Sequence, residues 1–278
     1  MSSILFNDLP NHLKETAEGF WVAEKASKVG AECWDESTDF LEVEADSFWH
    51  EHRNRCLLTV CQRFVPGGRL WDVGGGTGIV SDFLKKNGIL TGLIEPQLRI
   101  AQMARKRGVN PVIATTFEAA VNKTSVLDAA ALCDVLEHIE DDVAFLQSLK
   151  TCLKPGGYLY LTVPAYGWLW SSRDEGSHFR RYHQPMLRKA LTSAGFKIDY
   201  ISYFFSWLPP VLLATRVLPD KLGLTQNSTS HYYREHSPKK KIIRSIGLKA
   251  FQWELSMIRQ GRSIPFGASL LAVASAPR

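Results

Sequence analysis

Short apolar runs alternate with amphipathic segments through the middle of the chain, between residues 70 and 204. The apolar runs are typical of buried strands, and the segments between them are typical of helices with one apolar face. Strands are predicted over 69–73, 90–94, 111–114, 127–133, 157–163 and 197–204, and helices over 79–87, 97–107, 141–152 and 184–194. Repeated strand–helix units build a parallel sheet with helices on both faces, so the alternation predicts an α/β fold.

Two regions flank this predicted core of residues 69–204. Residues 1–68 look helical and are expected to form an N-terminal cover. Residues 205–266 contain an apolar double-proline stretch and an amphipathic helix near 242–259, and a last strand within 267–278 is expected to return to the sheet. Loops in such units usually have 2–6 residues, so about 60 residues before the last strand form a helical insert.

Composition excludes several classes of protein. The 278 residues are 45% hydrophobic and 22% charged, as in ordinary globular proteins, which excludes a disordered tail or a disulfide scaffold. The five cysteines form no CxxC pair, so neither a complete disulfide framework nor a metal finger is predicted. The chain starts without a signal-peptide pattern, and its longest apolar stretch, Tyr203 to Ala214, is too short to span a bilayer. We therefore expect a cytoplasmic protein.

The net charge of +5 is distributed unevenly. Residues 1–69 carry 7 basic and 12 acidic side chains, residues 70–204 carry 15 and 13, and residues 205–278 carry 11 and 3. The C-terminal region is therefore basic as well as partly apolar, and Lys239–Lys241 are suited to contact with anionic headgroups at a membrane surface. No RNA-binding module or dispersed basic face is present in the sequence, so we expect no nucleic-acid partner.

The strongest chemical signal is the stretch LWDVGGGTG at residues 70–78, an apolar strand that enters a glycine-rich turn. Glycines let the backbone turn sharply and let a ligand approach the main chain closely; a merely tight turn is the alternative. A nicotinamide site of the GxGxxG type requires glycine where this chain has Ile79. The spacing through Gly74, Gly76 and Gly78 therefore points away from a dinucleotide.

Five segments follow one another along the chain: DVGGGTG, LIEP, LDAAALCDVLEHIEDD, LKPGGYLYLTVPA and AGFKI. In this order they resemble the successive motifs of class I S-adenosylmethionine-dependent methyltransferases of a bacterial subgroup. The resemblance implies a Rossmann-like, mostly parallel seven-stranded sheet whose last strand is antiparallel. It also implies transfer of the methyl group of S-adenosylmethionine to a small-molecule or lipid-linked acceptor, with oxygen favoured as the nucleophile. The apolar stretch from Tyr203 to Ala214 is expected either to pack as a lid over the acceptor pocket or to form an apolar patch for a lipid-like acceptor or a membrane surface.

The resemblance assigns the methionine and ribose parts of the cofactor to the first two strands. Asp72, with Gly74, Gly75 and Gly76, would hold the methionine end. Glu95 lies at the carboxyl end of the second strand, where an acid accepts hydrogen bonds from ribose hydroxyls.

The adenine end is assigned to two further segments. Pro96 and Gln97 would lie beside the ring, and Thr116 and Phe117 belong to the segment at its edge. Many members of the family have an aspartate there, for which this chain offers Thr115 and Thr116.

Residues at the end of the fourth strand are assigned to the reacting methyl group. Cys133 and Asp134 would flank it, although a buried small apolar residue explains Cys133 equally well. His138 lies just beyond and is a candidate general base; the alternative is a histidine that caps local backbone. Asp134, Glu137 and His138 also resemble the acid–x–x–Glu–His arrangement of quinone-type O-methyltransferases, which is associated with magnesium. Aspartate replaces the usual glutamate here, so no metal site is predicted.

The loop over residues 166–182 resembles a "D…GH.RRY" block of the bacterial subgroup and is expected to line the acceptor pocket. Asp174, His178 and Tyr182 are its candidate catalytic residues. The alternative is a salt-bridged network that fastens the loop, for example between Arg181 and Asp174.

One segment and two rival functions remain. Residues 48–55 resemble the N-terminal segment of the same subgroup and are expected either to close over the cofactor or to pack as an amphipathic helix. A nicotinamide-dependent oxidoreductase is the rival enzyme class. A catalytically inactive methyltransferase fold that acts as an interaction module is the rival without activity.

Overall fold

The structure is a computed structural model that describes residues 13–23, 47–121, 127–172, 174–224 and 241–278, with only the backbone for 241–248. The run of seven acidic residues from Glu32 to Asp46 lies outside the described residues. Lys239 and Lys240 lie outside them as well.

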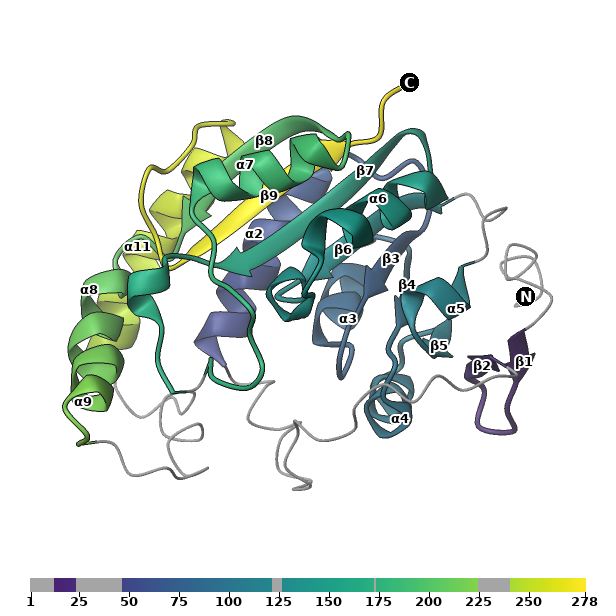
Figure 1. The fold of residues 1–278 in the computed structure, drawn as a ribbon, viewed down its shortest axis with the longest axis horizontal. Helices are drawn as coiled ribbons and strands as arrows, with labels where there is room; N and C mark the ends of the chain where they lie inside the picture. Colours follow the sequence, from purple (N-terminus) through teal and green to yellow (C-terminus); the bar gives the residue numbers. More distant parts are fainter. Residues whose placement is uncertain (1–12, 24–46, 122–126, 173, 225–240) are drawn as a thin grey trace.

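Nine strands form one sheet in the order β1-β2-β5-β4-β3-β6-β7-β9-β8 (Figure 1). Their bounds are β1 (Leu13–Glu15), β2 (Trp21–Ala23), β3 (Leu70–Val73), β4 (Thr91–Ile94), β5 (Val112–Ala114), β6 (Leu127–Cys133), β7 (Leu153–Pro164), β8 (Lys197–Phe204) and β9 (Ser269–Ser275). Strands β3 to β7 pair in parallel, whereas β9 is antiparallel to both of its neighbours. The predicted seven-stranded Rossmann-like sheet with an antiparallel last strand is therefore confirmed, with two short strands added at one edge.

Helices cover both faces of the sheet (Figure 1). The helices between the strands are α2 (Phe48–Arg63), α3 (Ile79–Lys86), α4 (Leu98–Lys106), α5 (Phe117–Ala120), η1 (Leu136–His138), α6 (Asp142–Cys152), η2 (Gly167–Leu169) and α7 (Gln184–Ser193). Alternate residues of a strand point to opposite faces. Accordingly, Ala130 and Leu132 of β6 pack with α6 and α7, whereas Ala129 and Ala131 pack with α2, α3 and α11 (Lys241–Arg259). Because both faces are buried, the parallel strands are mostly apolar in sequence.

The N-terminal region differs from the helical cover that the sequence predicts. Residues 48–63 are helical as expected, but β1 and β2 form a short hairpin instead of helix. Trp21 pairs with Ile113 and Val22 with Ala114, so the hairpin extends the sheet beyond β5. An edge strand offers unpaired backbone groups, and a short segment with Trp and Val readily satisfies them.

The insert before β9 is helical, as expected, through α8 (Leu208–Leu212), the π-helical η3 (Leu213–Val217), α9 (Leu218–Lys221) and α11. Phe251 and Ile258 of α11 are buried with residues of α2, so the insert and the N-terminal helix pack on the same face of the sheet. Within the described residues, no helix combines the length and apolar character that crossing a membrane requires.

Candidate functional site

The glycine-rich turn after β3 has a backbone that only glycine adopts readily. Gly74, Gly76 and Gly78 have φ angles of +68°, +55° and +79°. A Cβ atom on Gly75 would lie 2.8 Å from Cγ of Asp72, so a side chain there would displace that carboxylate. A Cβ on Gly76 would meet nothing within 4 Å. The turn therefore leaves open space beside Gly76 while its other residues are tightly constrained.

Asp72 is fully buried at the start of this turn. Its Oδ2 accepts a hydrogen bond of 2.9 Å from the Ser81 hydroxyl, while its Oδ1 has no hydrogen-bond partner among the described residues. Burial raises the pKa of Asp72 to about 6, although Ser81 and the nearby Arg53 act in the opposite direction. A buried acceptor atom without a donor is suited to a positively charged ligand group.

Glu95 connects the end of β4 to the glycine turn. Its Oε2 accepts from the Gly76 N–H over 3.0 Å, and its Oε1 accepts from the Gln97 N–H over 2.9 Å. Burial raises the pKa of Glu95, and these two hydrogen bonds oppose the shift. Each carboxylate oxygen still has a second lone pair. Pro96 and Gln97 follow at the start of α4 and are half-buried.

The end of β5 differs in detail from the predicted adenine edge. Thr116 is the N-cap residue of α5, and Phe117 is buried in the core with its ring centroid 5.8 Å from that of Phe145. Thr115 is buried, and its hydroxyl has no hydrogen-bond partner in the described part of the chain. Of the two threonines that the sequence offers here, Thr115 is therefore the one whose buried hydroxyl is unsatisfied.

Cys133 and Asp134 end β6 beside the glycine turn. Burial, together with the neighbouring Asp72, raises the pKa of the Cys133 thiol well above its ordinary value. Asp134 has a φ of +57°, and its carboxylate accepts hydrogen bonds from Arg53 over 2.7 Å and from the Thr162 hydroxyl over 3.0 Å. Sequence reasoning did not single out Arg53; its only signal was the resemblance of residues 48–55.

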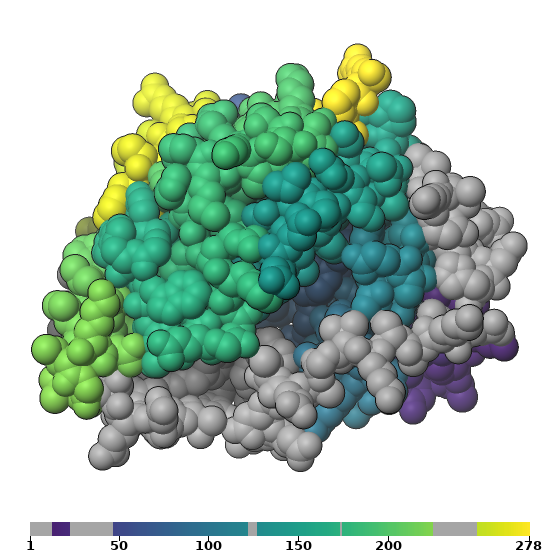
Figure 2. Space-filling view, in the orientation of Figure 1, coloured from purple at the N-terminus to yellow at the C-terminus, as the bar shows by residue number. Residues whose placement is uncertain are grey.

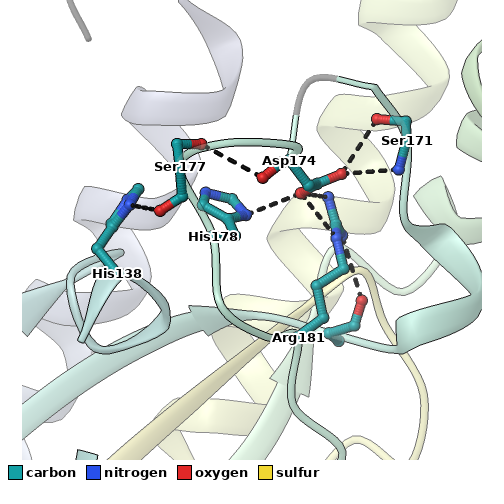
Figure 3. A network of polar contacts seen from close by, with 7 residues as sticks. His138, Ser171, Asp174, Ser177, His178 and Arg181 are labelled. Carbon is teal, nitrogen blue, oxygen red and sulfur yellow. Dashed lines mark hydrogen bonds and ion pairs between the residues drawn. The ribbon is translucent and has the colours of Figure 1, made fainter. Parts of the chain in front are cut away.

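Asp174 is the centre of a polar network in the acceptor-side loop (Figure 3). Its Oδ1 accepts from Nε and Nη2 of Arg181 over 2.9 and 2.7 Å, and its Oδ2 accepts from the backbone N–H of Ser171 over 2.9 Å. Nδ1 of His178 lies 2.8 Å from Oδ1. Burial alone would raise the pKa of Asp174, but His178 and Arg181 hold it well below the usual range. The Arg181–Asp174 ion pair that the sequence offered as an alternative is thus present.

His138 and His178 come together from separate segments. Nδ1 of His138 donates a hydrogen bond of 2.8 Å to the Ser177 carbonyl, and the two imidazole centroids are 4.6 Å apart at an angle of 76°. Partial burial of the ring lowers the pKa of His138, whereas the hydrogen bond to Ser177 acts to raise it. The residue as a whole is still exposed to solvent. Figure 2 shows a recess near the centre of the face in view, with dark blue atoms visible behind teal ones.

Tyr182 has no exposed surface. Its hydroxyl donates to Oδ2 of Asp142 over 2.7 Å, and burial with this neighbour raises its pKa far above the ordinary value. The structure therefore places this predicted catalytic residue in the core beneath the loop rather than in open space.

Glu137 is the buried neighbour of these histidines. It is 1% exposed, and its Oε2 has no hydrogen-bond partner in the ranges that the structure describes. Glu137, His138 and His178 each offer one potential metal-ligand atom, and these atoms lie within 4.8 Å of one another.

Comparison with known proteins agrees with this architecture. Residues 46–201, more than half of the chain, match the family described as a methyltransferase domain. A ubiquinone biosynthesis O-methyltransferase of Xanthomonas oryzae is 28% identical over 105 residues, which cover 36% of this chain and 44% of that protein. The enzyme of the same name from Xylella fastidiosa is 28% identical over 150 residues, covering 46% and 61%. The chain thus spans less than two thirds of the length of these relatives.

Solved structures share the fold at low sequence identity. A SAM-dependent methyltransferase of Thermotoga maritima, described as a possible histamine N-methyltransferase, superimposes with a TM-score of 0.53 at 17% sequence identity. The match covers 86% of this chain and 94% of the Thermotoga chain. A putative methyltransferase in a complex with the Haloferax volcanii Trm112 activator has a TM-score of 0.55 and 16% identity, covering 85% and 94%. The fold and the sheet-edge site define a Rossmann-like methyltransferase. This chain belongs to the methyltransferase domain family, which argues against the nicotinamide-dependent alternative.

Proposed function

We propose that this protein transfers the methyl group of S-adenosylmethionine to an oxygen atom of a small-molecule or lipid-linked acceptor. The observation that carries the proposal is the buried Asp72 carboxylate, whose Oδ1 has no hydrogen-bond donor among the described residues. The sulfonium of the cofactor supplies an already activated methyl group, so the protein has chiefly to position the reactants.

The residues at the strand ends fit the parts of this cofactor in order. Oδ1 of Asp72 accepts from the methionine ammonium, and the spare lone pairs of Glu95 accept from the ribose hydroxyls. The Thr115 hydroxyl, one of the two that the sequence offers at this position, accepts from the adenine amino group. Cys133 stays a neutral thiol beside the methyl group, because burial raises its pKa.

The acceptor binds at the ends of β6 and β7, beside His138 and His178. A hydroxyl nucleophile has to lose its proton, and imidazoles at this position are suited to receive it. The relatives whose printed names are ubiquinone biosynthesis O-methyltransferase support oxygen as the methylated atom. Asp174 and Tyr182, which the sequence offered as catalytic, are positioning residues in this proposal, because Asp174 is saturated with donors and Tyr182 is buried.

A lipid-linked acceptor and contact with a membrane surface remain part of the proposal. They are supported by the exposed apolar side chains on and after the helices α8 and α9, namely Val211, Leu218, Leu222 and Leu224. The excess of basic residues in the same C-terminal region adds attraction for anionic headgroups. We propose a cytoplasmic location and no nucleic-acid partner.

Calorimetry with S-adenosylhomocysteine tests the cofactor assignment. Wild type should bind, and Asp72→Ala and Glu95→Ala should each weaken binding about tenfold or more, because each removes hydrogen bonds to a charged or buried group. Asp82→Ala on α3, which removes a surface pair with Lys86, is the matched control and should bind normally. No binding by wild type, or full binding by both site variants, would overturn the proposal. Turnover of radiolabelled cofactor in a cell extract then separates an enzyme from an inactive interaction module.

A further inference from the structure

Three potential metal ligands converge beside the acceptor position from two segments that are distant in sequence. Glu137 and His138 lie in η1, and His178 lies in the loop before α7. The segments are tied together by hydrogen bonds from the Phe179 N–H to the Glu137 carbonyl and from His138 to the Ser177 carbonyl, each 2.8 Å long. One ligand atom from each of the three side chains lies within 4.8 Å of the other two.

Both imidazoles have Nδ1 beside an oxygen atom of the protein. Nδ1 of His138 donates a hydrogen bond to the Ser177 carbonyl, and Nδ1 of His178 lies in an ion-pair contact with the Asp174 carboxylate, 2.8 Å away in each case (Figure 3). A carbonyl oxygen only accepts, so Nδ1 of His138 carries the proton and its Nε2 keeps a lone pair. Histidine ligands of metals commonly donate their second N–H to such an oxygen, which fixes the ring and makes the free nitrogen more basic. Asp174 is itself held by Arg181 and Ser171.

The buried Glu137 carboxylate is otherwise unexplained. Its Oε2 has no hydrogen-bond partner among the described residues, and burying a carboxylate without compensation is costly. The two guanidinium groups that act on it, Arg53 and Arg181, are hydrogen-bonded to Asp134 and Asp174 instead. A cation at the cluster would supply the missing partner.

We propose that Glu137, His138 and His178 bind one divalent transition-metal ion, such as Zn²⁺ or Co²⁺, with an open position toward the acceptor. Two nitrogens and one carboxylate oxygen favour such ions over Mg²⁺, which prefers oxygen ligands. Ligands about 2.1 Å from a tetrahedral ion are roughly 3.4 Å apart, so ligand atoms that lie within 4.8 Å of one another have to approach by up to about 1.4 Å. The set differs from the acid–x–x–Glu–His magnesium pattern, because Asp134 is occupied by Arg53 and Thr162 and His178 takes its place.

The inference rests on the proposed function only for the location of the acceptor. A hydroxyl bound at the open position becomes more acidic, so its O–H bond breaks and the proton leaves to water. The oxygen lone pair then forms the new C–O bond while the C–S electrons return to sulfur, which turns the sulfonium into a neutral thioether. In this arrangement the two imidazoles promote loss of the proton from the acceptor hydroxyl by holding the ion, and they do not accept that proton themselves.

Cobalt titration of the full chain tests the site without any need for activity. The protein is prepared without a polyhistidine tag, stripped of metal and titrated with Co²⁺, and the visible absorption of the bound ion is recorded. We expect one Co²⁺ per chain, displaced by Zn²⁺ but not by Mg²⁺. His178→Ala and the nearly isosteric Glu137→Gln should each weaken binding at least tenfold. His183→Asn, which keeps a cap for the Met186 N–H in an exposed position outside the cluster, is the control and should bind Co²⁺ like wild type.

Binding of S-adenosylhomocysteine by each variant reports its folding and separates the two proposals. Loss of Co²⁺ binding with retained S-adenosylhomocysteine binding supports the metal site. Absence of Co²⁺ binding by wild type, or equal affinity in wild type and both cluster variants, overturns it. Co²⁺ binding that depends on His178 in a chain that does not bind S-adenosylhomocysteine supports the metal site and contradicts the proposed function instead.

Discussion

Arg53 on the N-terminal helix α2 donates a hydrogen bond of 2.7 Å to Asp134 at the end of β6. The Arg53 side chain is 8% exposed, and Asp134 is a non-glycine residue with a positive φ of +57°. The ion pair therefore holds Asp134 in an unfavourable backbone conformation at the end of β6. The residue that holds it comes from helix α2 and not from the sheet.

Replacement of Arg53 tests how far this contact stabilises the protein. Arg53→Met leaves the Asp134 carboxylate without its cation, so we expect the free energy of unfolding to fall by about 2 kcal/mol. Arg55→Met on the same helix breaks an exposed pair with Glu51 and should cost less than about 0.5 kcal/mol. Denaturant titration measures both, and equal losses would contradict the role assigned to Arg53.

The pKa of Asp72, raised to about 6 by burial, predicts a pH-dependent affinity for S-adenosylhomocysteine. Only the ionised carboxylate attracts the ligand's ammonium group, so affinity should fall as the pH falls through about 6, approaching tenfold per pH unit below it. The stability of the ligand-free protein should change in the opposite direction. Since the folded-state pKa is raised, protonation of Asp72 stabilises the fold as the pH falls from about 6 toward 4.

Calorimetry across this pH range measures the effect. Asp72→Asn should bind more weakly and lose the inflection near pH 6. An inflection that persists in Asp72→Asn belongs to another group and would refute the assignment.

Glu254 is predicted to fasten the insert to the sheet and to α2. It accepts hydrogen bonds from the Phe205 N–H, the Ser206 N–H and hydroxyl, and lies 2.7 Å from Nε2 of His52. Burial by itself raises the pKa of Glu254, but these hydrogen bonds outweigh it and hold the pKa below its usual value. Glu254→Gln should therefore lower the free energy of unfolding at neutral pH by about 2 kcal/mol.

The sign of this shift sets the pH dependence. A lowered folded-state pKa gives stability that is present above the usual glutamate pKa and is lost as the pH falls through the folded value. The difference between wild type and Glu254→Gln should thus narrow in acid. Unfolding curves at neutral and acidic pH test it, with Glu51→Gln at an exposed site as the control. If the difference in unfolding free energy stayed constant or widened in acid, the charged form of Glu254 would not be what stabilises the fold.

Tyr182→Phe separates a structural from a catalytic role for this residue. Removal of the hydroxyl breaks the 2.7 Å hydrogen bond to Asp142, so we expect a loss of about 1 kcal/mol in the free energy of unfolding. Turnover should change little once an acceptor is known. A fall in kcat of a hundredfold or more with unchanged stability would restore the catalytic assignment.

Local patterns in the sequence predicted the core strands well because each buried parallel strand is apolar on both faces. The short hairpin of β1 and β2 was not predicted, since three-residue strands carry no measurable periodicity and form only because the edge of β5 offers a partner. The cofactor side of the site could likewise be proposed from adjacent residues. Asp72 and the glycines are consecutive in sequence, and Glu95 ends the neighbouring strand.

The sequence by itself determined the parallel sheet, the glycine turn and the place of the acid on the second strand, because these depend on spacing along a few residues. Only the tertiary structure decided which distant residues act together. It brought Arg53 to Asp134 across 81 positions and His178 beside His138, and it buried Tyr182 beneath its own loop. Such contacts depend on how loops and helices pack over the strand ends, which hydrophobic periodicity does not specify.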